Sequence, residues 1–140
     1  EAQLSDRLAF DPVLSWRSVI SEVKEIPAGG YVGYDFVERV SRPTKMAVIP
    51  IGYWHGFDRG LSGIGEVLIG GARARVLGRV SMDIIVVDVS GIRCRVGEVA
   101  TIIGKSGRDV VSAAECAQRI TTSPYEIITR INPLIERVIC

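Results

Sequence analysis

The stretch "GEVLIGGARARVLGRVSMDIIVVDVS", residues 65–90, carries the clearest evidence for the fold. A short apolar run leads to Gly70 and Gly71, and two more strand-like runs follow. Adjacent glycines between apolar runs are typical of a β-hairpin turn, because glycine reaches positive φ at little steric cost. In the last run, the alternation of side chains predicts a strand with one apolar and one polar face. The apolar face is Val80, Met82, Ile84 and Val86, and the polar face is Arg79, Ser81 and Asp83.

Strand patterns continue on both sides of this stretch. Residues 13–24 have a β-rich composition with partial alternation, "TKMAVIPIGY" at 44–53 fits a buried strand, and "VGEVATIIG" at 96–104 repeats the pattern. Helix signals appear only near the C-terminus, where "SAAE" at 112–115 and "SPYE" at 123–126 place a serine three residues before a glutamate. The sequence therefore predicts a mainly β, barrel-like domain of at least six strands, with two short helices near the C-terminus.

Composition limits the classes of protein to which the chain can belong. A length of 140 residues with 47% hydrophobic residues suits one folded domain with its own core. The net charge of +1 gives no indication of binding to nucleic acid or to an anionic membrane surface. No run of about 18 apolar residues could cross a bilayer. We therefore expect neither a nucleic-acid partner nor a membrane partner.

Cysteine usage favours a reducing compartment. Cys94, Cys116 and Cys140 are an odd number without C-x-x-C spacing, and His55 is the only histidine. This pattern predicts neither a disulfide framework nor a metal site, and it favours a cytoplasmic location. The chain begins at Glu1 and not at a methionine, so we expect a processed product or a piece of a longer protein.

No single side chain identifies a reaction. His55 lies in a glycine-rich and aromatic stretch that suits a locally hydrogen-bonded loop. Tyr34 and Tyr53 both follow a glycine, but a tyrosine with a pKa of about 10 is a poor base unless positive charge stabilises its phenolate. A candidate for a Schiff-base lysine would have to come from three residues in uninformative positions, Lys24, Lys45 and Lys105.

Several segments, read together, resemble one known family, the C-terminal β domain of alanine racemase. The resemblance covers nearly the whole chain from Pro12 onward, so we expect residues 12–140 to form this domain and residues 1–11 to be a linker or the end of a preceding segment. The segments that carry it, in this order, are "PVLSWRSVISEVKEIPAGGYVGYD", "IPIGYWHGFDRGLS", "GEVLIGGARARVLGRVSMDIIVVDVS", "GEVATIIG" and "TSPYEIITRI".

The resemblance implies a cofactor and two protein partners. Alanine racemases use pyridoxal 5′-phosphate (PLP) to interconvert L- and D-alanine, and D-alanine is used for bacterial peptidoglycan. The family has an N-terminal (β/α)8 barrel that holds PLP on a lysine, and it forms homodimers. The chain is thus expected to work with such a barrel and with a homodimer partner, and to be inactive alone.

The resemblance also implies roles for individual residues. Racemisation needs proton exchange on both faces of a planar intermediate, and the family uses the PLP lysine on one face and a tyrosine from the partner subunit on the other. Tyr34, in "VGYD", matches that tyrosine. Met82 matches the residue whose backbone N–H contacts the substrate carboxylate, and Tyr53 matches a tyrosine of the substrate entrance. Arg59 matches an arginine farther out in the same entrance. Arg79 and Asp83 match polar residues that support the region near Met82.

Asp35 departs from the family pattern, which often has glycine after the catalytic tyrosine. A carboxylate beside a phenolate is electrostatically unfavourable. We therefore expect Asp35 to point away from Tyr34, or to be neutralised by Arg39 or Arg42.

Two other functions stay open at the level of sequence. One is a stand-alone binding or interaction module that has the same fold and no catalytic activity. The other is the corresponding domain of a racemase for another amino acid, such as serine, because substrate size is partly set by barrel residues outside this sequence.

Overall fold

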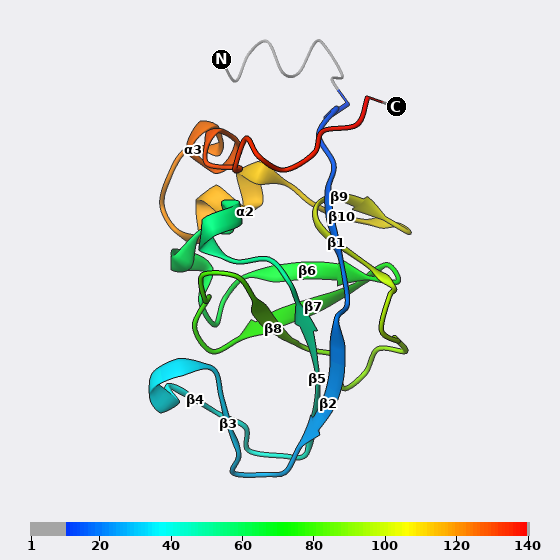
Figure 1. Cartoon of the computed structure of the whole chain (residues 1–140), viewed down its shortest axis with the longest axis vertical. Helices are drawn as coiled ribbons and strands as arrows, with labels where there is room; N and C mark the ends of the chain where they lie inside the picture. Colours follow the sequence, from blue (N-terminus) through cyan, green and yellow to red (C-terminus); the bar gives the residue numbers. More distant parts are fainter. Residues whose placement is uncertain (1–10, 140) are drawn as a thin grey trace.

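The computed structural model describes residues 11–139, and most of its strands belong to one antiparallel sheet (Figure 1). The order in this sheet is β1-β9-β6-β7-β8-β5-β2, and β10 pairs with β9. Its strands are β1 (Trp16–Val19), β2 (Glu22–Ile26), β5 (Thr44–Ile49), β6 (Glu66–Ile69), β7 (Ala72–Leu77), β8 (Ile85–Asp88), β9 (Val99–Ser106) and β10 (Asp109–Val111). A separate ribbon pairs β3 (Tyr31–Val32) with β4 (Glu38–Arg39). The prediction of a mainly β fold is confirmed.

The sheet is not closed into a barrel, which corrects one part of the predicted architecture. Its two ends are β1 and β2, which are separated along the chain only by Ile20 and Ser21. The N–H of Ile20 donates to the carbonyl of Glu98 at 2.9 Å, and the N–H of Ser21 donates to that of Val48 at 2.9 Å. The chain thus changes partners between these two residues. The one strand predicted for residues 13–24 is therefore two strands, at opposite ends of the sheet.

The hairpin predicted at Gly70 and Gly71 is confirmed. Strands β6 and β7 pair up to Ile69 and Ala72, the residues that flank the two glycines. Gly70 has a φ of +58° and Gly71 a φ of +81°, a left-handed conformation at both central residues that side chains with a Cβ rarely adopt.

The strand predicted through residues 79–86 is wrong in its first part. β8 begins only at Ile85, and residues 78–84 form a loop in which the N–H of Ser81 donates to the carbonyl of Ile84 at 3.1 Å. The positive φ of Gly78, +66°, turns the chain out of β7 and ends the alternation. The buried residues in and just after β8 are Ile85, Val87 and Val89, whereas Met82 and Ile84 are exposed.

Two short helices lie at one end of the molecule, and the β3–β4 ribbon lies at the other (Figure 1). Both predicted serine caps are confirmed. Ser112 accepts from the N–H of Glu115 at 3.0 Å, before α2 (Ala113–Arg119). Ser123 accepts from the N–H of Tyr125 at 3.2 Å, before α3 (Pro124–Thr129), in which Pro124 occupies the first turn. Neither described helix is long and apolar enough to span a membrane.

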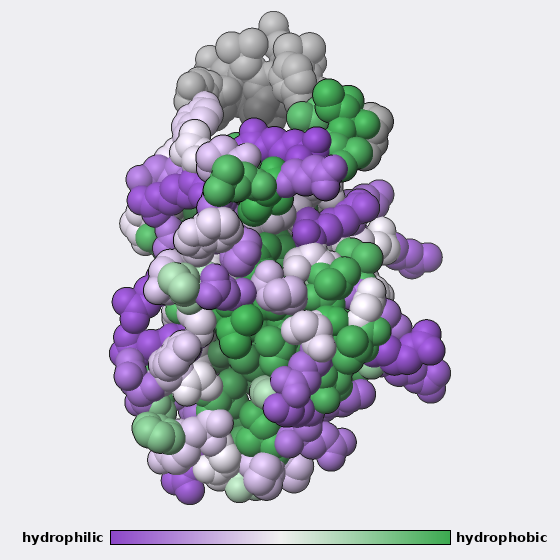
Figure 2. Space-filling view, in the orientation of Figure 1, coloured by the Kyte–Doolittle hydropathy of each residue, from purple (hydrophilic) through white to green (hydrophobic). Residues whose placement is uncertain are grey.

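The β3–β4 ribbon packs on a small hydrophobic cluster of its own. Val32 and Val40 are buried there against Leu77 of β7, apart from the main core between the central strands and the helices. Partly buried side chains of Ile26 and Met46 extend this cluster. Figure 2 shows hydrophobic side chains at the middle of one face, over the central strands, with hydrophilic side chains on both sides. The packing of Val32 and Val40 against Leu77 thus attaches the ribbon to the sheet, in addition to its chain connections.

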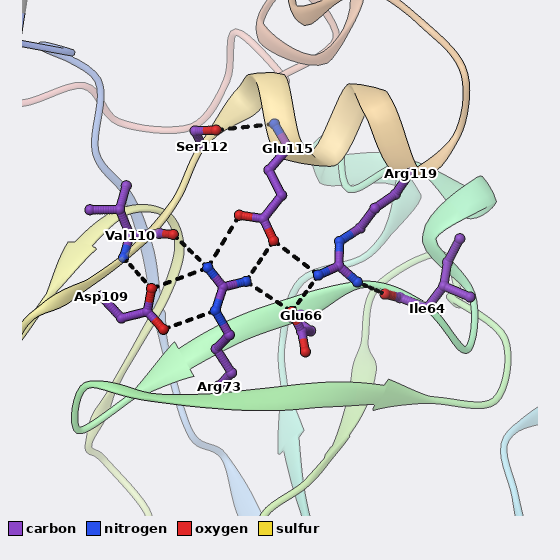
Figure 3. A network of polar contacts seen from close by, with 8 residues as sticks. All are labelled: Ile64, Glu66, Arg73, Asp109, Val110, Ser112, Glu115 and Arg119. Carbon is purple, nitrogen blue, oxygen red and sulfur yellow. Dashed lines mark hydrogen bonds and ion pairs between the residues drawn. The ribbon is translucent and has the colours of Figure 1, made fainter.

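Arg73 of β7 lies at the centre of an ion network that connects the β6–β7 hairpin to β10 and α2 (Figure 3). Its guanidinium lies 2.9 Å from Glu66, 2.9 Å from Asp109 and 2.5 Å from Glu115. Arg119 lies between Glu66 and Glu115. The hydrogen bond from Arg73 lowers the pKa of Glu115 below its ordinary value, and it does the same for Asp109. The carboxylate of Glu115, the glutamate of "SAAE", therefore pairs with Arg73 and Arg119.

Replacing Arg73 with methionine should lower the free energy of unfolding by about 2 kcal/mol, between the values for exposed and for buried ion pairs. Glu66 and Glu115 would then share Arg119, and Asp109 would lose its arginine partner. Because the folded-state pKa of Glu115 is lowered, its contribution is present above the ordinary value of 4.5 and is lost as the pH falls through the lowered pKa. The difference in free energy of unfolding between wild type and variant should therefore become smaller in acid.

Urea unfolding at neutral pH and in the acid range below 4.5 measures this difference. Arg95→Met is the matched control, because Glu98, at 3.3 Å, is the one ion-pair partner of Arg95 within residues 11–139, and the Arg95 side chain is 88% exposed. Equal stability of wild type and Arg73→Met at neutral pH would show that the network contributes nothing.

Candidate active site

Three chain segments meet on one side of the molecule, where they enclose a cavity of about 600 Å³. They are the 3₁₀ turn η1 (Tyr34–Phe36), the segment from η2 (Tyr53–His55) to η3 (Arg59–Leu61), and the loop 78–84. The cavity lining includes five of the six predicted site residues and leaves out Asp83. The lining residues are Tyr34, Asp35, Tyr53, Arg59, Arg79, Val80, Ser81 and Met82.

Close backbone contact joins η2 to the loop 78–84. The N–H of Tyr53 donates to the carbonyl of Ser81, and the N–H of Trp54 donates to that of Met82, both at 3.0 Å. A Cβ on Gly52 would lie 2.2 Å from the Ser81 oxygen and 2.4 Å from the Met82 oxygen. Only glycine fits there, so the backbone of "GRVSMD" accounts for the glycine of "IPIGY".

Tyr34 lies on a strained and exposed turn. Gly33 before it has a φ of +78°, and a Cβ there would lie 3.3 Å from the backbone N of Arg79. Asp35 and Phe36 after it have φ values of +61° and +52°, a region that residues with side chains seldom occupy. The side chain of Tyr34 is 64% exposed. The turn thus presents its tyrosine to the cavity and to solvent.

His55 supports the turn that carries Tyr53. Its Nδ1 accepts from the N–H of Gly52 at 3.1 Å, so its ring proton must lie on Nε2 in this arrangement. Its ring lies edge-on to Trp54, with centroids 5.0 Å apart, and its carbonyl accepts from the N–H of Asn132 at 3.0 Å. The predicted local hydrogen bonding of this histidine is confirmed.

Asp35 pairs with a residue that sequence reasoning did not assign to it. Its Oδ2 lies 3.4 Å from Nε of Arg79. The expectation of a pair with Arg39 or Arg42 is wrong, because the Arg39 side chain donates to the carbonyl of Gly29 at 3.0 Å. Within residues 11–139, Arg42 makes no ion pair. Asp35 has a left-handed backbone in this arrangement. The glycine that the family often has at this position is the sequence signal for that conformation, because glycine adopts positive φ at little cost.

Comparison with known proteins identifies the family. The model of the family described as "Alanine racemase, C-terminal domain" matches residues 13–139. The chain belongs to this family. The alanine racemase of Leptospira interrogans is 41% identical over 131 residues, which are 93% of this chain and 34% of that protein. The alanine racemase of Methylacidiphilum infernorum is 36% identical over 132 residues, 94% of this chain and 34% of the relative. The chain therefore spans about a third of the length of these racemases, which are isomerases.

Solved alanine racemases have the same fold as this domain. The enzyme from Bacillus anthracis with bound L-Ala-P superposes with a TM-score of 0.86 at 32% identity, over 94% of this chain and 34% of the other. The enzyme from Bartonella henselae with covalently bound pyridoxal phosphate gives a TM-score of 0.81 at 28% identity, over 89% of this chain and 34% of the other. The chain corresponds to the C-terminal domain of such enzymes.

Arg59 of this racemase domain lies where three hollows adjoin. It lines the cavity already described, a neighbour of about 590 Å³ that also includes Glu38, and a third of about 370 Å³ that includes Arg130. Arg130 pairs with Asp58 at 2.5 Å. Neither residue of this pair was singled out from the sequence, because 72 residues separate them along the chain.

The chemistry of the cavity suits an anionic group. It offers two tyrosine hydroxyls, the guanidinium groups of Arg59 and Arg79, and the N–H of Met82, which has no acceptor among the described residues. The one carboxylate of the lining, that of Asp35, pairs with Arg79. Guanidinium and N–H donors match the oxygens of a carboxylate or a phosphate. None of the lysines at positions 24, 45 and 105 lines these three hollows, so the described residues bring no lysine amine to the cavity for a Schiff base. Its residues fit one side of a PLP site.

The other titratable candidates lie outside this cavity. Cys94 and Cys116 are buried free thiols, and burial raises the pKa of Cys116 to about 11, which makes it a poor nucleophile at neutral pH. Cys140 lies outside the described residues. Within residues 11–139, no group of three or more His, Cys, Asp or Glu side chains could hold a metal ion.

Proposed function

We propose that this chain forms the C-terminal part of a PLP-dependent alanine racemase and supplies Tyr34 as one of its two bases, across the interface of a homodimer. The observation that carries the proposal is the convergence of Tyr34, Tyr53, Arg79 and Met82 on one open cavity that contains no lysine. Such a half-site needs a second protein part to supply the amine that binds the cofactor. An N-terminal barrel of the same protein family would supply that amine.

PLP, when bound, supplies the electron sink that makes the α-proton of an amino acid acidic. The oxygen of Tyr34 would take this proton from one face of the substrate, or return it there. Neighbouring positive charge stabilises a phenolate, and Arg59 lines the same cavity. Arg79 lines it too and offsets the negative charge of Asp35. The other face needs a different base, because a single base would return the proton to the face it came from.

Met82 and Tyr53 would fix the substrate during this transfer. The free N–H of Met82 can donate to the substrate carboxylate, and the loop that bears it is held to η2 by two backbone hydrogen bonds. Tyr53, 48% exposed, would narrow the entrance to a small amino acid. Positioning of this kind accounts for a large part of enzymatic rate enhancement. Alanine is the substrate that we propose, with D-alanine for peptidoglycan as its use and the cytoplasm as its location.

The test is racemisation by a full-length protein in which this chain follows a PLP-binding barrel. We expect conversion of L- to D-alanine with PLP, and a much slower reaction with serine in a panel of amino acids. The 140-residue chain with PLP and L-alanine should give no D-alanine. Turnover by the 140-residue chain, or a full-length protein that racemises none of the panel, would contradict the proposal.

A further inference from the structure

We propose that Asp35 is a positioning residue for Tyr34, which acts through its ion pair with Arg79. This inference rests on the proposed function and deepens it. The pair spans two of the three segments that enclose the cavity, because Asp35 belongs to η1 and Arg79 to the loop 78–84. That loop also carries Met82. The pair would therefore set the distance between the proposed base and the N–H that would bind the substrate carboxylate.

The η1 turn has no internal feature that would hold it in its conformation. It is three residues long, it contains no buried residue, and no side chain caps its start. Asp35 and Phe36 both have positive φ, which disfavours this conformation in an isolated peptide. Contacts from elsewhere in the chain must therefore stabilise the turn.

One such contact is edge-on packing of Phe36 against the ring of Tyr31, with centroids 5.2 Å apart. Others come from the start of the loop 78–84. The backbone of Gly33 packs against that of Gly78 and Arg79. After the turn, Oε2 of Glu38 accepts from the N–H of Gly78 at 3.3 Å. A hydrogen bond from Arg75 lowers the pKa of Glu38, which keeps this acceptor ionised. Among the side-chain contacts of the turn, that of the Asp35 carboxylate with Arg79 is the nearest in sequence to Tyr34.

The pair is too exposed to affect global stability strongly. The side chain of Asp35 is 67% exposed and that of Arg79 is 40% exposed. Exposed ion pairs contribute little to the free energy of unfolding. A positioning role thus predicts a loss of catalytic rate with no change in melting temperature, whereas a purely structural role predicts a fall in both or in neither.

Two substitutions at Asp35 distinguish the effect of its carboxylate from the effect of its backbone conformation. Asp35→Gly accepts the left-handed φ at least as well as aspartate but has no carboxylate. Asp35→Asn also tolerates this φ, and its amide oxygen can still accept from Arg79 without the charge. In the full-length racemase we expect kcat to fall about 10-fold for the glycine variant and less for the asparagine variant, since a misplaced catalytic group costs up to about 10²-fold.

Three further readouts report on geometry. The α-deuterium isotope effect should rise in only one direction of racemisation for Asp35→Gly, namely the direction in which Tyr34 removes the proton. Asp35→Gly combined with Arg79→Gln should be no slower than the slower single variant, because the two act as a pair. The ¹⁹F signal of 3-fluorotyrosine at position 34 should broaden or split in Asp35→Gly. The control is the exposed pair of Arg95 and Glu98, 3.3 Å apart. Glu98→Ala should change neither the rates, nor the isotope effects, nor the ¹⁹F signal.

The outcomes distinguish this inference from the proposed function. If Tyr34→Phe abolishes racemisation while Asp35→Gly keeps the wild-type kcat, isotope effects and ¹⁹F spectrum, the positioning role is wrong and the proposed function stands. A full-length protein without racemase activity overturns both. A full-length racemase in which Asp35→Gly slows both directions equally, with a lower melting temperature, also overturns the positioning role.

Discussion

Replacing Tyr34 with phenylalanine in the full-length racemase should lower kcat for L- and D-alanine by about 10² to 10⁴-fold, the usual cost of removing a general base. Both directions should be affected, because each requires proton transfer on both faces. The Tyr34 ring is 64% exposed, and its hydroxyl makes no hydrogen bond within residues 11–139. Loss of the oxygen should therefore leave the melting temperature and the PLP absorbance spectrum unchanged. Steady-state rates in both directions, with these two measurements, test this.

Tyr31→Phe is the matched control. Tyr31 lies three residues before Tyr34 and is 50% exposed, but its ring packs edge-on to Phe36 and beneath the guanidinium of Arg39. The control should racemise as wild type does. In Tyr34→Phe, exchange of the α-proton with deuterated solvent should persist for one enantiomer, through the base on the other face. A Tyr34→Phe variant with full activity would show that Tyr34 is not a base and that its role is structural.

Features of the fold that depend on neighbouring residues could be predicted from the sequence. The two glycines at 70 and 71 determine a hairpin turn because both have left-handed φ. Ser112 and Ser123 begin the two helices because each accepts from a free N–H of the first turn. These rules act over a few residues, and the chain obeys them at each of these positions.

Features that depend on distant contacts could not be predicted in this way. The bend between Ile20 and Ser21 arises because these residues bond to opposite ends of the sheet. The loop 78–84 resembles a strand in its alternation, but its carbonyls at Ser81 and Met82 accept from η2 instead of from a neighbouring strand. Hydrophobic alternation does not report which backbone partner a segment will find.

The candidate site divides in the same way. The resemblance to the family gave five residues that line one cavity, yet it could not supply the contacts between them. The pair of Asp35 with Arg79 crosses between two loops and depends on a left-handed aspartate. Asp83, predicted from its place beside Met82, does not line the cavity, because the chain there is a loop and not a strand.

Replacing Gly52 with alanine should destabilise the domain by about 3 kcal/mol and reduce racemisation, since overpacking usually costs about 1–3 kcal/mol and lost backbone hydrogen bonds add to it. The new Cβ would lie 2.2 Å from the Ser81 oxygen, a backbone atom that cannot rotate away as a side chain can. The loop 78–84 would have to move, and the hydrogen bonds from Tyr53 and Trp54 would lengthen. Urea unfolding and steady-state kinetics of the full-length variant measure both effects.

Gly91→Ala is the control for this substitution, because a Cβ on Gly91 meets nothing within 4 Å and its φ is not positive. It should unfold and racemise as wild type does. Displacement of the loop also predicts a specific kinetic result for Gly52→Ala. KM for alanine should rise together with the fall in kcat, because Met82 would lose its position relative to the substrate carboxylate. A variant with lower stability but unchanged KM and kcat would show that the contact of Gly52 with the loop serves the fold alone.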